Sequence, residues 1–140
     1  MLFRILHIGA FISLLLAFLT SCSQEVPKKW QQLGIPNEGI IKVYSHTNEN
    51  GFYADYDGYT SGKLIETIAS NLQASGYSEV CSKFDGMVKG FQKGNEKYIL
   101  KVVDLGEKSG ISLFNEHGEE PLLFGICFKG YRLSDPVRYK

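Results

Sequence analysis

The stretch GKLIETIASNLQASGY, residues 62–77, decides how this chain folds. Its apolar side chains fall on one stripe at the period of an α-helix. The stripe consists of Leu64, Ile65, Ile68, Ala69 and Leu72. Thr60 or Ser61 can cap the free amides at the start, and Gly76 is well placed to end the helix in the left-handed conformation. The pattern predicts one amphipathic helix over about 62–75.

Short runs rich in β-branched and aromatic residues lie on both sides of this helix, as is typical of strands. Two runs precede it and five follow it: 40–46, 52–56, 77–84, 87–92, 97–105, 111–115 and 122–128. The run 97–105 is apolar on both faces, which favours a central strand. The predicted fold is therefore α+β, with one amphipathic helix packed on a mainly antiparallel sheet of five to seven strands. The expected order is β-β-α-β-β-β-β.

The N-terminal 21 residues have the features of a signal peptide. The apolar stretch 5–19 is shorter than the roughly 18–20 residues that a membrane-spanning helix needs. It ends in Leu19-Thr20-Ser21-Cys22, which resembles the lipobox of bacterial lipoproteins. This resemblance covers only residues 1 to about 24. It implies that residues 1–21 are cleaved off between Ser21 and Cys22, and that the Cys22 thiol takes up a diacylglyceryl group before its new amino terminus is acylated.

The expected location of the mature chain follows from the same resemblance. An acylated Cys22 makes a lipid bilayer the first partner of the protein. Ser23 rather than Asp after the cysteine is similar to the pattern that sends Gram-negative lipoproteins to the outer membrane. We expect a lipid-anchored protein that faces the periplasm, more in the outer than the inner membrane. An uncleaved anchor and an ordinary secretory signal are the alternatives.

The rest of the chain divides into an arm, a domain and a tail. Residues 22–39 are expected to be a lipidated tether whose second half packs on the domain, 40–130 the α+β domain, and 131–140 a C-terminal tail. An exposed Trp30 that stacks on a ligand is the alternative for the arm. Fifteen Lys and Arg against fifteen Asp and Glu leave no basic stripe, which argues against a nucleic-acid partner.

Two cysteines remain once Cys22 is acylated. Cys81 and Cys127 each fall in a predicted strand, and an exported protein meets an oxidising compartment. A disulfide between them is the favoured interpretation, and two small buried thiols that never meet are the alternative.

Other short patterns fall short of known sites. The segment 58–63 has three residues between its glycines where a phosphate loop needs four, so helix capping explains it better. The segment 55–58 lacks the glutamate that completes a calcium loop. His46 and His117 have no cysteine or carboxylate at the spacing of metal ligands. We expect no catalytic residue, no metal and no cofactor.

The sequence thus favours a non-catalytic interaction module on a membrane, binding an envelope protein or a small ligand. One alternative is an immunity lipoprotein that neutralises a toxin in the periplasm. The other is a small envelope hydrolase that uses His46, Asp55 or His117.

Overall fold

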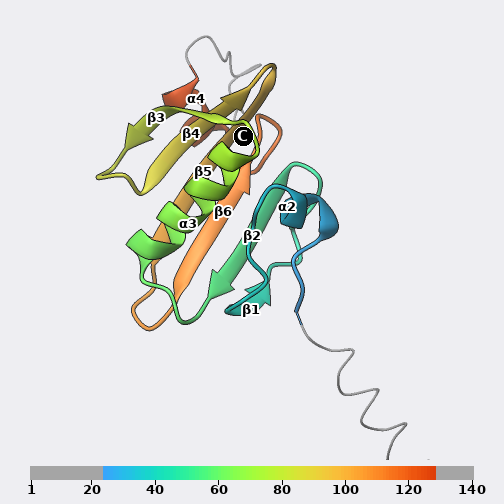
Figure 1. The fold of residues 1–140 in the computed structure, drawn as a ribbon, viewed down its shortest axis with the longest axis vertical. Helices are drawn as coiled ribbons and strands as arrows, with labels where there is room; N and C mark the ends of the chain where they lie inside the picture. Colours follow the sequence, from blue (N-terminus) through green and yellow to red (C-terminus); the bar gives the residue numbers. More distant parts are fainter. Residues whose placement is uncertain (1–23, 129–140) are drawn as a thin grey trace, which may run out of the picture.

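A computed structural model describes residues 24–128 of the chain. Its centre is a six-stranded antiparallel sheet in the order β1-β2-β6-β5-β4-β3 (Figure 1). The strands are β1 Ile40–Val43, β2 Gly51–Tyr56, β3 Ser78–Lys83, β4 Val88–Lys93, β5 Glu96–Asp104 and β6 Ser109–Phe114. The helices are α2 Lys28–Gln32, α3 Ser61–Ala74 and α4 Pro121–Cys127. The predicted α+β class and the order β-β-α-β-β-β-β are confirmed.

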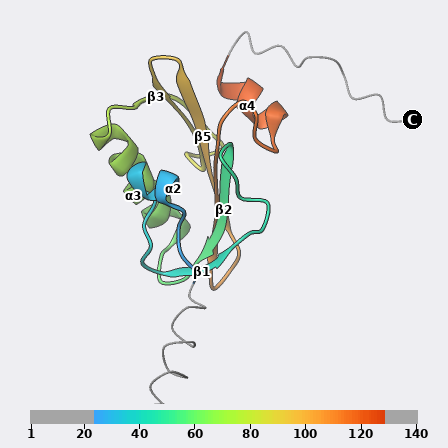
Figure 2. The same ribbon diagram turned by 90° about the vertical axis from the view of Figure 1, so that its right-hand side faces the viewer.

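Helix α3 lies across one face of the sheet, here called the front face. Figure 2 shows α2 and α3 on this side of the sheet and α4 on the other, the back face. The Thr60 hydroxyl accepts a 3.2 Å hydrogen bond from the Lys63 amide, and Gly76 follows the helix with a φ of 94°. All five apolar residues of the predicted stripe are buried. The prediction of one amphipathic helix with these ends is confirmed.

Strand β5 is the longest strand and lies inside the sheet, between β4 and β6. Its Leu100 belongs to the apolar core under α3, whereas its neighbour Ile99 belongs to a second apolar cluster on the back face. Successive side chains of a strand point to opposite faces, so a strand covered on both sides needs apolar residues at consecutive positions. The central position predicted for 97–105 is confirmed.

The segment before β1 is packed on the front face beside α3. Trp30, in α2, is only 1% exposed and lies with its ring centroid 6.2 Å from Phe52 and 6.0 Å from Tyr98. The Asn71 side-chain amide of α3 donates a 2.7 Å hydrogen bond to the Gly34 carbonyl. Residues 24–39, expected to be a tether with a packed second half, therefore contribute to the core from Val26 onward. The alternative of an exposed, ligand-stacking Trp30 is wrong.

The last predicted strand, 122–128, is also wrong, because α4 occupies this stretch. Pro121 stands at the start of the helix, where its fixed φ and missing N–H are tolerated. Phe124 and Phe128, four residues apart, are buried on one side of the helix and pack with Val88 and Phe114 on the back face. Seven residues are too few for apolar periodicity to separate a helix from a strand.

A disulfide between Cys81 of β3 and Cys127 of α4 attaches this helix to the sheet, with 5.4 Å between the two Cα atoms. The bond crosses the back face above Gly90 of β4. A Cβ atom at that position would lie 3.1 Å from the Cβ atoms of both cysteines. The pair is therefore the one that the sequence favoured, although Cys127 lies in a helix and not in a strand.

Several expectations fall on residues outside 24–128. These are the signal peptide 1–21, the cleavage site at Ser21 and Cys22, the acylation of Cys22, and the tail 131–140. Within 24–128, no helix is both long and apolar enough to cross a membrane.

Candidate functional site

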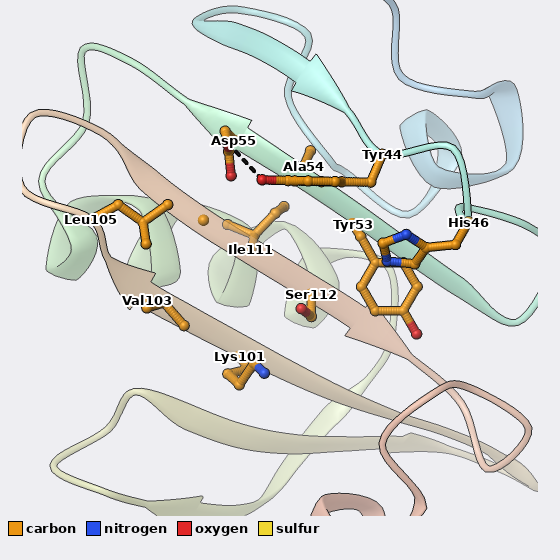
Figure 3. A pocket seen from close by; sticks show the side chains of 11 residues that line it. Tyr44, His46, Tyr53, Ala54, Asp55, Lys101, Val103, Leu105, Ile111 and Ser112 are labelled. Carbon is orange, nitrogen blue, oxygen red and sulfur yellow. Dashed lines mark hydrogen bonds between the residues drawn. The ribbon is translucent and has the colours of Figure 1, made fainter.

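The back face of the sheet is only partly covered. Helix α4 contacts β3, β4 and β5, and so leaves the β2 side of this face open. An open hollow of about 230 Å³ lies there (Figure 3). Its lining combines aromatic, apolar and charged side chains from β2, β5, β6 and the segment after β1. The principal lining residues are Tyr44, His46, Tyr53, Asp55, Lys101, Val103, Leu105 and Ser112.

Asp55 is the buried charge of this hollow. It is the next-to-last residue of β2 and is only 2% exposed. One carboxylate oxygen, Oδ2, accepts a 2.9 Å hydrogen bond from the Tyr44 hydroxyl. The same oxygen forms a 3.1 Å ion pair with Lys108 Nζ. A buried carboxylate is tolerated only when such donors replace water. The hydrogen bond to Asp55 is the main cause that raises the pKa of Tyr44, because it favours the protonated phenol.

An aromatic pair forms the neighbouring wall. The His46 ring packs on Tyr53 with a centroid distance of 4.4 Å. The Tyr53 hydroxyl accepts a 3.1 Å hydrogen bond from the Glu119 amide, and burial raises the pKa of this phenol. The Glu119 carboxylate in turn lies 3.6 Å from His46 Nε2. The wall is thus held between β2 and the loop that precedes α4.

The loop that precedes α4 also supplies a carboxylate to Lys101, the cation on the other side of the hollow. Lys101 of β5 donates to both carboxylate oxygens of Glu120, at 2.6 and 2.8 Å. Lys101 lies directly opposite Ser112 in the pairing of β5 with β6, so the two side chains share this face. The charges around the hollow are therefore already paired within the chain.

The structure brings together two of the three residues considered for a hydrolase. His46 and Asp55 line the same hollow, but His46 pairs with Glu119, whereas Asp55 is held by Tyr44 and Lys108. The third, His117, lies 3.6 Å from Glu116. Among residues 24–128 there is no group of three or more His, Cys, Asp or Glu side chains that could hold a metal ion.

The segments 58–63 and 55–58, which resemble a phosphate loop and a calcium loop, form a helix cap and a turn. Thr60 caps α3, and the Asp57 carboxylate accepts a 2.8 Å hydrogen bond from the Gly58 amide. Asp55 of the segment 55–58 lines the hollow, where it forms an ion pair with Lys108.

Sequence reasoning missed Tyr44, Lys101 and Lys108 as residues of this site. One signal was available: a carboxylate within a strand whose other residues are apolar or aromatic needs a partner. The sequence offers no way to choose that partner, since Lys108 lies 53 positions from Asp55.

This arrangement is suited to binding. It offers three aromatic rings, two exposed apolar side chains, Val103 and Leu105, and polar groups whose positions are already fixed by hydrogen bonds. Such pre-ordered, mixed surfaces are typical of binding sites. No protein-family model, curated protein or solved structure matches this chain.

Proposed function

We propose that this chain is an envelope lipoprotein whose folded domain acts by binding and not by catalysis. Cys22 carries the lipid, the bilayer holds the domain on the periplasmic side, and the outer membrane is the favoured location. Support for the anchor comes from the apolar stretch 5–19 and the lipobox-like sequence Leu19-Thr20-Ser21-Cys22.

The observation that carries the binding role is the state of Asp55. A catalytic carboxylate must come within hydrogen-bond reach of the substrate proton that it takes or gives. Here Oδ2 is bonded to both Tyr44 and Lys108, and the side chain is almost fully buried. The exposed residues of the lining include the apolar Val103 and the His46 ring, which both offer contact area to a partner. The hollow therefore presents a contact surface with a rigid polar base.

The test is site-specific cross-linking in living envelopes. A photoreactive amino acid at Val103, on the rim of the hollow, should give one discrete adduct with an envelope component. The matched control is the same amino acid at Val80, an exposed valine on the edge strand β3. No adduct at position 103, or the same adduct at both positions, would contradict the proposal.

A second variant shows whether the adduct depends on the hollow. Ser112 lies on its floor (Figure 3) and is half-buried, so Ser112→Trp fills the space without changing a charge. The adduct at Val103 should be lost in Ser112→Trp while the circular dichroism spectrum and the thermal midpoint stay close to those of the parent. A folded Ser112→Trp protein that still gives the full adduct would argue against this surface.

A further inference from the structure

The described chain is fixed in place from its first residues. Gln24 accepts a 3.0 Å hydrogen bond from the Val43 amide of β1 through its side-chain oxygen. The Val26 amide donates a 2.8 Å hydrogen bond to the Asn37 side chain, and the Val26 carbonyl accepts one of 2.7 Å from Gln31. Val26 itself is buried in the core under α3. The chain is therefore already bonded to the domain at Gln24.

This start lies very close to the proposed anchor. Cys22 precedes Gln24 by two positions, and two residues at full extension span only about 7 Å. If Cys22 is acylated, as the proposed function has it, no flexible tether separates the domain from the lipid. The part of its surface around Gln24 must then lie at the bilayer.

That part of the surface carries two exposed apolar side chains. Ile41 is 47% exposed and sits where the pairing of β1 with β2 shifts register, an irregularity that turns a side chain out of the regular pattern. Leu105, in the turn between β5 and β6, is 45% exposed. The two line one surface hollow together with Asp57, Gly106, Glu107 and Lys108. We call these six residues the anchor end.

The arrangement of the elements places the anchor end on the side of the molecule where the described chain begins. Figures 1 and 2 both place β1, the turn between β5 and β6, and the start of the described chain at one end of the molecule. Helix α4 lies at the opposite end in both views. A bilayer that receives the lipid of Cys22 therefore meets Ile41 and Leu105 on the same side.

The charges of the anchor end indicate what kind of contact it makes. Asp57 and Glu107 are two carboxylates, whereas the ammonium of Lys108 is paired with Asp55. Attraction to anionic headgroups would need a group of basic residues. Apolar side chains beside a lipid anchor instead suit shallow insertion at the boundary between headgroups and acyl chains.

We propose that the anchor end is a membrane-contact surface, on which Ile41 and Leu105 enter the headgroup region of the bilayer that holds Cys22. This inference rests on the proposed function. It adds an orientation: the binding hollow on the back face opens sideways, just above the lipid surface.

Quenching by lipids that carry a shallow nitroxide tests this orientation. The acylated protein is reconstituted in vesicles of phosphatidylethanolamine and phosphatidylglycerol, with an environment-sensitive dye on Ile41→Cys. The control is Leu122→Cys, which places the dye on an exposed leucine of α4 at the far end. The dye reaches only the new thiol, because Cys81 and Cys127 are bonded to each other and Cys22 bears lipid.

We expect the nitroxide lipid to quench the Ile41→Cys dye at least about twofold more than the Leu122→Cys dye. A flexible Gly-Ser insert of about ten residues between Ser23 and Gln24 gives the domain a tether of roughly 18 Å, and should remove this difference. Equal quenching at both positions, in protein whose intact mass shows acylated Cys22, would overturn the orientation alone. Protein without lipid on Cys22 would overturn the proposed function and this inference with it.

Discussion

The Tyr44 hydroxyl donates a 2.9 Å hydrogen bond to Asp55 Oδ2, which joins the segment after β1 to a buried carboxylate of β2. The only other ion pair or hydrogen bond of this carboxylate within residues 24–128 comes from Lys108, whose side chain is about half exposed. The buried charge thus depends on one hydrogen-bonded phenol and one partly solvated ammonium.

Removing the phenol hydroxyl should therefore be costly. We expect Tyr44→Phe to lower the free energy of unfolding by more than the control substitution below, because a buried charged acceptor loses a donor. Urea denaturation followed by circular dichroism measures this change. Tyr59→Phe is the control, since its half-buried ring packs on Tyr56 but its hydroxyl has no hydrogen bond in the described part of the chain. Equal losses in the two variants would contradict the assigned role of Tyr44.

The disulfide should contribute strongly to stability. It closes a loop with a sequence separation of 46, for which the chain-entropy model gives about 4 kcal/mol. The double variant Cys81→Ser, Cys127→Ser should therefore unfold at a clearly lower urea concentration than the parent. Hydrogen exchange should rise most in α4, a seven-residue helix that packs mainly through Phe124 and Phe128. A parent protein with the same denaturation midpoint with and without reductant would contradict this prediction.

The domain should need its N-terminal segment in order to fold. A variant that begins at Ile40 lacks Val26, Trp30 and Ile35, and it uncovers the Phe52 and Tyr98 rings on the front face. We expect this variant to show no cooperative unfolding, whereas one that begins at Gln24 folds and unfolds cooperatively. Loss of a buried tryptophan alone costs about 3–5 kcal/mol. Equal stability of the two would show that residues 24–39 are only an arm.

Alkaline pH should destabilise the fold through its buried tyrosines. Burial is the main cause that raises the pKa of both Tyr56 and Tyr77, and the hydrogen bond to Glu96 adds to it at Tyr77. The unfolded chain loses these protons from about pH 10, whereas the folded chain keeps them. The unfolded state then binds fewer protons, so stability is complete below pH 10 and falls as pH rises above it.

Urea denaturation at several pH values above 10 measures this fall. The variant Tyr56→Phe should have a shallower pH dependence, by up to about 1.4 kcal/mol per pH unit. A merely structural effect of that substitution would shift the whole curve and leave its slope unchanged. Stability that stays constant from about pH 9 to about pH 11 would contradict the prediction.

The sequence predicted the elements whose apolar pattern is long or whose ends are marked. The stripe from Leu64 to Leu72 with a cap before it and Gly76 after it was sufficient for α3. Consecutive apolar residues in 97–105 were sufficient to place β5 inside the sheet. The stretch 122–128 was too short for its period to be read, and its burial depends on the back face and on Cys81.

The site could not be predicted to the same degree, because its contacts join positions that are far apart in the chain. Asp55 was noted as part of a local turn pattern and as one candidate for a hydrolase, but its partners come from after β1 and from the turn after β5. Trp30 gave no sequence signal that separates a core residue from an exposed one, since its neighbours Lys29 and Gln31 are polar. Its burial follows from the position of α2 against β2 and β5.

The central claim is that lipid on Cys22 holds the domain at a bilayer, and intact-mass spectrometry of the protein purified from envelopes tests it most directly. The account predicts a mature chain that begins at Cys22 and carries a diacylglyceryl group and an N-acyl chain, both of which are lost in Cys22→Ser. A chain that keeps residues 1–21, or an unmodified Cys22 in a protein whose envelope location is unaffected by Cys22→Ser, would contradict it.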